Sequence, residues 1–161
     1  MRIGVVSDTH NNLKNVRKIV ELFNTASVDA VIHTGDISQA KTLQVFADLQ
    51  APMVGVFGNN DEERDSLEQA IKQHGFQFQE PPLELEWHNR RIVVVHDPLE
   101  LEGVQTPEHE LVLHGHTHLY RLERKANQLV FNPGECAGHM QGYNAVGLVD
   151  LATMTVELLK F

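Results

Sequence analysis

The chain has 161 residues, 42% of them hydrophobic, and we expect a single domain over residues 1–161 with a core of its own. Its formal net charge of −9 argues against binding to long nucleic acid, because such binding needs basic surface to replace counterions. One cysteine excludes an internal disulfide, and the lack of a signal-peptide pattern or an apolar run of membrane-spanning length predicts a cytoplasmic protein without a membrane partner.

The first half of the chain alternates apolar runs of strand length with helical patterns. The runs lie at Ile3–Val6, Ala30–Ile32 and Met53–Phe57, and Asn11 or Asn12 is placed to cap the helix after the first run. The apolar residues at helical spacing are Leu13, Val16, Ile19, Val20 and Phe23, then Leu43, Phe46 and Leu49, then Leu67, Ala70 and Ile71. This βαβαβα order predicts a largely parallel sheet with helical crossovers.

The second half of the chain is rich in strand-like runs that turn residues separate. Leu83–Trp87 and Ile92–Val95 flank a turn, and Leu111–Leu113 leads into a Gly-His-Thr-His segment. The pattern leaves the helical content of residues 98–109 open. Two sheets packed together, with helices outside, would bury both halves of the chain in one core. Further strands are expected at Leu119–Leu122, Leu129–Phe131, Ala145–Val149 and Thr155–Leu159.

Polar side chains of the kinds that bind metals follow the expected strands. Asp8 and His10 follow the first strand, Asp36 the second and Asn59 the third. The candidates that follow strands of the second half are His96, His116 and His118. Residues beyond the carboxyl ends of strands converge even when they are far apart in sequence. We therefore expect these seven side chains to meet at one end of the sheets.

The residue types suit a pair of divalent transition metals. Carboxylates neutralise charge, imidazoles favour zinc, iron, nickel and related ions, and an Asn carbonyl supplies a neutral oxygen. Two metals roughly 3.5–4 Å apart share a hydroxide and hold both the attacking and the leaving oxygen of a phosphoryl group. Because metal coordination lowers the pKa of water, no protein nucleophile is needed. The pattern thus indicates a two-metal phosphoesterase.

Each motif also has a purely structural interpretation. Asp8-Thr9-His10 fits a strand end with a helix-capping turn, and Gly35-Asp36 and Gly58-Asn59 fit plain turns. The segment at residues 115–118 fits a surface hairpin, although alternate residues of an extended segment share one side. The occurrence of all these motifs directly after strands favours the metal site.

The combined motifs resemble those of the calcineurin-like metallophosphoesterases. Five motifs occur in the same order, namely Asp8-x-His10, Gly35-Asp36, Gly58-Asn59-x-Asp61, a strand-end His96 and Gly115-His116-x-His118. Their spacing is similar to that of the small prokaryotic phosphodiesterase branch, over residues 1–150, and Asn132–Cys136 is similar to the closing motif of that branch. The resemblance implies an α/β fold, a four-layer α/β/β/α sandwich of two mixed sheets.

The resemblance also implies a role for each ligand. The first metal would be held by Asp8, His10, Asp36 and His118, and the second by Asp36, Asn59, His96 and His116. Asp36 would bridge two divalent ions (Mn, Ni, Fe or Zn, with Mn favoured), and a metal-bridging hydroxide would attack the phosphorus. The implied substrate is a small phosphodiester, and homo-oligomers are common in the branch.

Two departures from the family pattern bear on the substrate. Many members have a His after the motif Asn, where this chain has Asn60, which donates a hydrogen bond to phosphate but supplies no proton. We predict that this catalytic Asn60 favours diesters, or acidic leaving groups, over alkyl monoesters. After His96 the family commonly has Gly, whereas Asp97 here either orients His96 or caps a turn before Pro98.

Several other polar residues have two interpretations. His33 and His114 are expected to be buried structural residues, with support of a metal ligand as the alternative. His109 is expected in solvent, and His139 lies in a loop that faces either the site or solvent. Arg64 pairs either with a substrate phosphate or with a surface carboxylate.

Three functions are compatible with these patterns. The first is a metal-dependent phosphodiesterase, and the second is a phosphomonoesterase on a small phosphorylated substrate, which leaving-group dependence would distinguish. The third is a non-catalytic protein-binding scaffold, like the retromer-subunit relatives of this fold. Such scaffolds have typically lost ligands, whereas this chain keeps all seven. The phosphodiesterase is therefore the preferred prediction.

Overall fold

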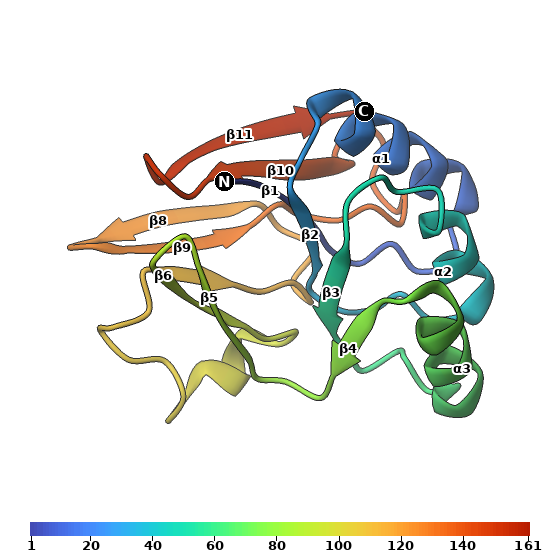
Figure 1. Ribbon diagram of the computed structural model, residues 1–161, viewed down its shortest axis with the longest axis horizontal. Helices are drawn as coiled ribbons and strands as arrows, with labels where there is room; N and C mark the ends of the chain where they lie inside the picture. Colours follow the sequence, from blue (N-terminus) through green and yellow to red (C-terminus); the bar gives the residue numbers. More distant parts are fainter.

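The structure, a computed structural model that describes residues 1–161, contains two mixed β-sheets packed face to face (Figure 1). The strands are β1 (Arg2–Val6), β2 (Ala30–His33), β3 (Met53–Val56), β4 (Gln77–Gln79), β5 (Leu83–Trp87), β6 (Arg90–Val94), β7 (Leu111–Leu113), β8 (Arg121–Lys125), β9 (Gln128–Asn132), β10 (Ala145–Asp150) and β11 (Thr155–Lys160). The first sheet has the order β11-β10-β1-β2-β3-β4 and the second β5-β6-β7-β9-β8. The α/β class with two mixed sheets is thus confirmed.

Three helices cover the outer face of the first sheet, on the right in Figure 1. They are α1 (Leu13–Ala26), α2 (Ala40–Phe46) and α3 (Arg64–His74), and each connects two parallel strands of this sheet. The crossovers through α1 and α2 were predicted. Asn12, one of the two expected caps, accepts a hydrogen bond from the Asn15 backbone N–H at the start of α1. No helix has both the length and the apolar character needed to cross a membrane.

Three buried clusters hold these layers together. The largest lies between the helices and the first sheet, and the second lies between the two sheets. The outer face of the second sheet is covered by the segment after β6, which contains a single 3₁₀ turn, η1 (Pro98–Leu101). Leu101 and Val104 pack there on a third, small cluster. The helical content of residues 98–109 is therefore one turn, and the fourth layer is reduced to this segment.

Two strands differ from the sequence prediction. β4 is an additional strand, which the pattern did not indicate because Phe78 is its only apolar residue. The strand expected at Leu119–Leu122 begins instead at Arg121, because the chain first turns through left-handed residues up to His118. β10 pairs antiparallel with β1, so the last two strands complete the sheet that the first half begins.

Candidate metal centre

The loops after β1, β2, β3, β6 and β7 meet at one end of the sheets and bring all seven predicted side chains together. Backbone hydrogen bonds join these loops: His10 N–H donates to Asp36 O at 2.9 Å, and Gly115 N–H donates to His96 O at 2.9 Å. Parallel strands end at the same edge of a sheet, so residues up to 110 positions apart in sequence become neighbours.

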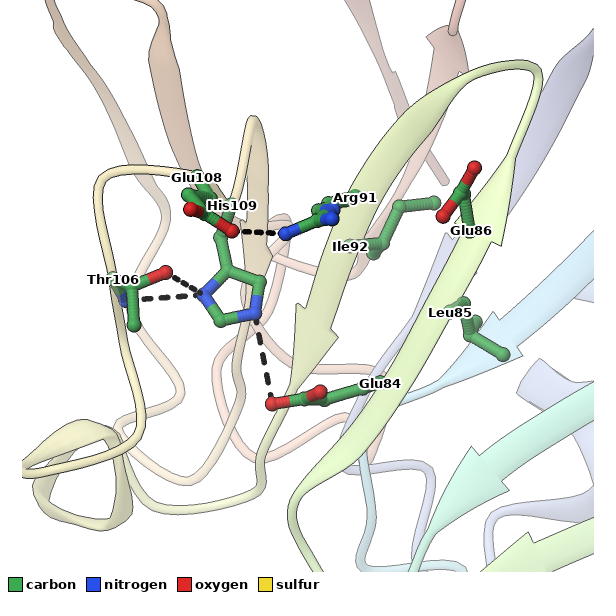
Figure 2. A pocket seen from close by; sticks show the side chains of 8 residues that line it. All are labelled: Glu84, Leu85, Glu86, Arg91, Ile92, Thr106, Glu108 and His109. Atoms are coloured by element: carbon green, nitrogen blue, oxygen red, sulfur yellow. Dashed lines mark hydrogen bonds and ion pairs between the residues drawn. The ribbon is translucent and has the colours of Figure 1, made fainter.

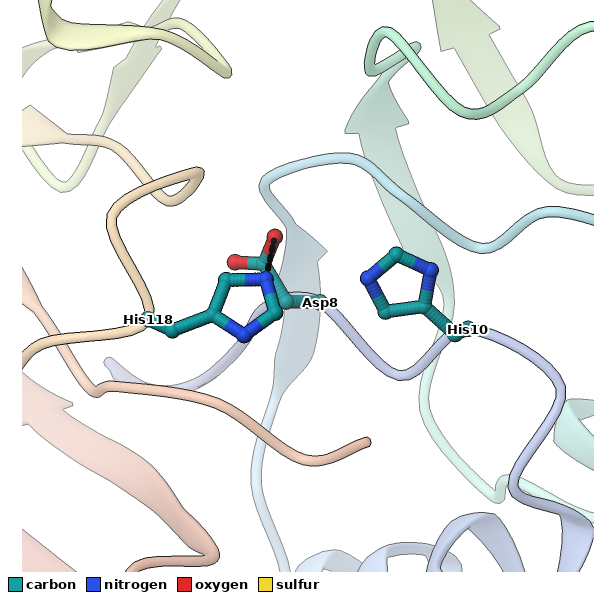
Figure 3. A group of neighbouring side chains, drawn as sticks. All are labelled: Asp8, His10 and His118. Atoms are coloured by element: carbon teal, nitrogen blue, oxygen red, sulfur yellow. Dashed lines mark ion pairs between the residues drawn. The ribbon is translucent and has the colours of Figure 1, made fainter. Parts of the chain in front are cut away.

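Asp8, His10 and His118 form the first ligand group (Figure 3). Their ligand atoms lie within 4.8 Å of one another, and His118 Nε2 is 3.3 Å from Asp8 Oδ1. Asp8 Oδ1 and His10 Nε2 are buried and have no hydrogen-bond partner. Buried polar atoms almost always have a hydrogen-bond partner or a bound ion, so two neighbouring buried atoms without a partner are consistent with a cation site. The donor set therefore fits a metal ion.

Asn59, His96 and His116 form the second ligand group. Asn59 Oδ1 lies 2.9 Å from His96 Nε2 and 3.0 Å from His116 Nδ1, and these two nitrogens are 3.3 Å apart. Asp36 Oδ2 lies 3.4 Å from His96 Nε2 and 3.6 Å from His10 Nε2. The same carboxylate oxygen is thus within reach of both groups.

Glycines of the motifs make room for the carboxylates. A Cβ atom at Gly115 would lie 2.0 Å from Ser7 Oγ and 2.7 Å from Asp8 Oδ2, and one at Gly58 would lie 2.2 Å from Asp36 Oδ1. The Ser7 hydroxyl and the His116 backbone N–H both donate to Asp8 Oδ2. The other oxygen, Oδ1, is therefore the one left to face the ligand group.

Backbone strain concentrates at the same residues. Five of the seven candidate ligands have a left-handed backbone, with φ between 43° and 66°. Such a conformation costs a non-glycine residue on the order of 1–2 kcal/mol, and it persists where surrounding structure imposes it, as at functional sites. The five are Asp8, His10, Asp36, His116 and His118. The sequence contains no signal for this, because none of the five is a glycine.

Asp61 fixes the loops after β2 and β3. Its side chain is buried, and Oδ2 accepts hydrogen bonds from the backbone N–H groups of Asp36 (3.0 Å) and Gly58 (2.7 Å), while Oδ1 accepts one from Ser38 (2.6 Å). Burial raises the pKa of this carboxyl above its usual value. Asp61 therefore orients the Asn59 loop.

The site has a strongly negative electrostatic field. Burial alone would lower the pKa of His96, but the hydrogen bond and charge of Asp36, together with the charge of Asp8, raise it to about 9. Burial alone would raise the pKa of Asp36, but hydrogen bonds from His96 and Asn60 hold it well below its usual range. Burial lowers the pKa of His10, which favours a neutral nitrogen. Cations bind ionised carboxylates and neutral imidazoles, so metal binding at His96 requires the release of its proton.

Each candidate ligand histidine also has a polar neighbour at its other ring nitrogen. Hydrogen-bond acceptors in this position set the tautomer and the orientation of metal-binding rings in general. The pairs are His96 Nδ1 with Thr34 O at 2.9 Å, His10 Nδ1 with Ser38 Oγ at 3.2 Å, His116 Nε2 with Asp97 Oδ2 at 3.6 Å, and His118 Nδ1 with Glu135 Oε2 at 3.8 Å. The sequence pattern alone assigns no role to Glu135 or Ser38.

Asp97 and Asn60 occupy positions that refine the sequence predictions. Asp97 caps η1 by accepting a hydrogen bond from Leu99 N–H at 2.9 Å, which confirms the capping alternative. The ligand that its other oxygen approaches is His116 and not His96. Asn60 Nδ2 donates to Asp36 Oδ2 at 2.7 Å, so its amide is bonded to the carboxylate shared by both groups.

The structure resolves the two interpretations of His33 and of His139, which both lie near the site. His33 is fully buried, accepts a hydrogen bond from Gly35 N–H at Nδ1, and contacts Thr9 Oγ1 through Nε2, as expected of a structural residue. The loop that carries His139 faces the site, since the His139 ring stacks on His118 with 5.4 Å between centroids.

His33 makes the stability of the protein depend on pH. Burial lowers its pKa from 6.5 to about 3. Between these two pH values the His33 ring therefore takes up a proton in the unfolded chain but not in the folded one. We expect the free energy of unfolding to fall by up to about 1.4 kcal/mol per pH unit in this range. Urea unfolding between pH 6 and 4 measures the slope. His33→Gln should flatten it and the exposed His88→Gln should leave it unchanged; equal slopes in the two variants would contradict the assignment.

His109 lies away from the seven residues, and its predicted exposure is wrong. Its side chain is buried at the edge of a pocket of about 480 Å³ that β5, β6 and residues 106–109 line (Figure 2). His109 Nδ1 accepts a hydrogen bond from Thr106 N–H at 3.0 Å, and Nε2 lies 3.7 Å from Glu84 Oε1. The residue folds back on its own turn, a contact that a polar sequence context does not indicate.

The chain is similar to known proteins over nearly its whole length. A family model described as the calcineurin-like phosphoesterase superfamily domain matches residues 1–154. Phosphodiesterase MJ0936 of Methanocaldococcus jannaschii is 34% identical over 155 residues, which are 93% of each chain. A solved structure described as a novel archaeal phosphodiesterase has a TM-score of 0.91 and 32% identity and covers 100% of both chains. The phosphoesterase Yfce of E. coli, at 19% identity and a TM-score of 0.73, covers 99% of this chain and 98% of its own, and shows the fold alone.

These matches include every loop that carries a candidate ligand. The seven side chains lie between residues 8 and 118, inside the range that the family model matches. The structural match extends over both sheets. This chain therefore belongs to the calcineurin-like phosphoesterase superfamily and is a hydrolase that acts on phosphate esters.

Proposed function

We propose that this chain is a metal-dependent phosphodiesterase with a dinuclear metal centre. The observation that carries the proposal is the position of Asp36 Oδ2, 3.6 Å from His10 Nε2 and 3.4 Å from His96 Nε2. A carboxylate oxygen within reach of two separate ligand groups suits a bridging ligand. The 34% identity with a protein named a phosphodiesterase supports the reaction.

The proposed ligands divide into two sets that share Asp36. The first set is Asp8, His10, Asp36 and His118, and the second is Asp36, Asn59, His96 and His116. This mixture of oxygen and nitrogen donors accepts Mn, Ni, Fe or Zn, and we favour Mn. When bound, two such ions lower the pKa of water and offset the charge of a phosphoryl group.

Several residues would orient a substrate at the solvent-exposed side of the site. Asp36 is buried, whereas Asn59, Asn60 and His116 are exposed, which gives a substrate access from this side. We assign to the second N–H of the Asn60 amide a hydrogen bond to a phosphate oxygen, because the first N–H donates to Asp36 Oδ2 and holds the amide at the site. The backbone carbonyl of Thr34 keeps the His96 ring in place through Nδ1.

A cavity beside the second ligand group supports a diester as substrate. It has a volume of about 260 Å³, and its lining includes Asn59, His96 and His116. A diester carries a second organic group, which this cavity has room to accept. Arg64 also lines it, and its guanidinium pairs with Glu80, as the surface-carboxylate alternative predicts.

Removal and return of metal tests the proposal. Protein stripped with EDTA should lose the hydrolysis of bis(p-nitrophenyl) phosphate and recover it as two Mn²⁺ ions bind per chain. His116→Asn should remain inactive, while the exposed His88→Asn should behave as the unmodified protein. Absence of bound metal and of hydrolysis with Mn²⁺, Ni²⁺, Fe²⁺ and Zn²⁺ would overturn the proposal.

A further inference from the structure

Glu135 is a buried carboxylate beside the first ligand group. It follows β9 in the Asn132–Cys136 motif, and its side chain has an exposed fraction of 0%. A buried carboxylate is unfavourable unless a cation or hydrogen-bond donors compensate its charge. No Lys or Arg lies near enough to do so, and its one ion-pair contact is with His118, whose Nδ1 is 3.8 Å away. The Glu135 carboxylate therefore interacts electrostatically with His118, a candidate ligand.

The loop after Glu135 is tied to the same carboxylate. Oε1 accepts a hydrogen bond from Met140 N–H at 2.8 Å, and Oε2 accepts one from His139 N–H at 3.3 Å. Both oxygens therefore act as acceptors. The His139 ring lies nearly parallel to the His118 ring, at an interplanar angle of 13°. Glu135 and this loop enclose His118 on the side of Nδ1.

His118 thus lies between two carboxylates, one on the side of its ring that faces the candidate metal site and one on the opposite side. Its Nε2 faces Asp8 at 3.3 Å, and its Nδ1 faces Glu135 at 3.8 Å. We propose that Glu135 is a positioning residue that accepts the Nδ1–H of His118, which leaves Nε2 unprotonated and strengthens it as a metal ligand. This inference rests on the proposed dinuclear centre.

Asp97 offers a matched comparison in the same molecule. Its Oδ2 lies 3.6 Å from the outer nitrogen of His116, so both carboxylates have the same relation to a candidate ligand. The Asp97 side chain is 30% exposed and that of His116 40%, against 0% for Glu135. Water screens an exposed pair far more than a buried one. The Glu135 contact should consequently have the larger effect.

Calorimetric titration of EDTA-stripped protein with Mn²⁺ tests the inference. Glu135→Gln should weaken binding at the first of the two sites by about 10- to 100-fold. Asp97→Asn, the matched variant, should weaken the second site by less than about fivefold. Circular dichroism and thermal unfolding establish that each variant is folded. Unchanged Mn²⁺ affinity in folded Glu135→Gln would overturn the inference.

A double-mutant cycle separates positioning from a general structural role. If Glu135 acts through His118, Glu135→Gln should cause no further loss of Mn²⁺ affinity in a His118→Ala background. An equal loss in both backgrounds would overturn the inference. Should Glu135→Gln fail to fold, ¹⁵N NMR of the unmodified protein loaded with Zn²⁺ decides the question. A protonated Nδ1 of His118 is expected, and an unprotonated Nδ1 would contradict it.

The number of Mn²⁺ ions bound per chain tests a different role for the same residues. Atoms of His118, Glu135 and His139 also lie within 4.8 Å of one another, as direct metal ligands would. Binding of three Mn²⁺ ions per chain, with the third lost in His139→Ala, would make Glu135 a ligand and overturn the positioning role. Failure of the unmodified protein to bind any metal would contradict the dinuclear centre itself, and this inference with it.

Discussion

Asp36→Asn is expected to lower kcat/KM for bis(p-nitrophenyl) phosphate by roughly 10³-fold, because the loss of one group that stabilises transition-state charge typically costs about 10²–10³-fold and Asp36 would hold both of the ions that supply this stabilisation. The substitution keeps the shape of the side chain but removes the charge that lies between His10 and His96. Both candidate ligand groups lose the negative charge of their shared carboxylate at the same time. Metal analysis of the purified variant should therefore find fewer than two ions per chain.

The fold should survive this substitution. Asn has nearly the size and shape of Asp, but despite burial, hydrogen bonds from His96 and Asn60 hold the pKa of Asp36 well below its usual range, so the folded protein favours the ionised carboxylate. The thermal midpoint of metal-free Asp36→Asn should accordingly fall below that of the unmodified protein, while the variant still unfolds in one cooperative transition. Asp48→Asn, which removes a charge at an exposed position, is the control. Full activity with two bound metals in Asp36→Asn would refute the bridging role.

Asn60→His is expected to shift the preference of the enzyme from diesters toward monoesters by roughly 10²-fold, the lower end of what a general acid contributes. A histidine there can protonate a poor leaving group, which an amide cannot do. The position is open to solvent and adjoins the carboxylate of Asp36, so an imidazole has space on the substrate side. Rates with p-nitrophenyl phosphate and bis(p-nitrophenyl) phosphate give the ratio.

The dependence of rate on the pKa of the leaving alcohol provides the stricter readout. A proton donor at position 60 should flatten this dependence for a series of phosphate monoesters. Asn60→Gln keeps an amide and supplies no proton, so its dependence should match that of the unmodified enzyme. If Asn60→His and Asn60→Gln behave alike, residue 60 does not determine the preference between monoesters and diesters.

Local sequence patterns determined most of the elements. The period of the apolar residues identified α1, α2 and α3, and the apolar runs identified the buried strands, because a buried face must recur with the period of its element. β4 and β8 are edge strands with little apolar surface, so their patterns were weak. The pairing of β10 with β1 joins residues about 145 positions apart. Local patterns contain no information on such pairings.

In the candidate site, too, some features were determined by the sequence and others only by the tertiary structure. The sequence by itself determined the ligand types and their places after strands, because coordination chemistry restricts ligands to a few residue types and parallel strands end together. Only the tertiary structure decided which groups surround them. It placed Glu135 against His118, Asp97 against His116, and Asn60 on Asp36. These contacts depend on how loops from distant strands pack at one end of two sheets, where burial and charge are properties of the assembled fold.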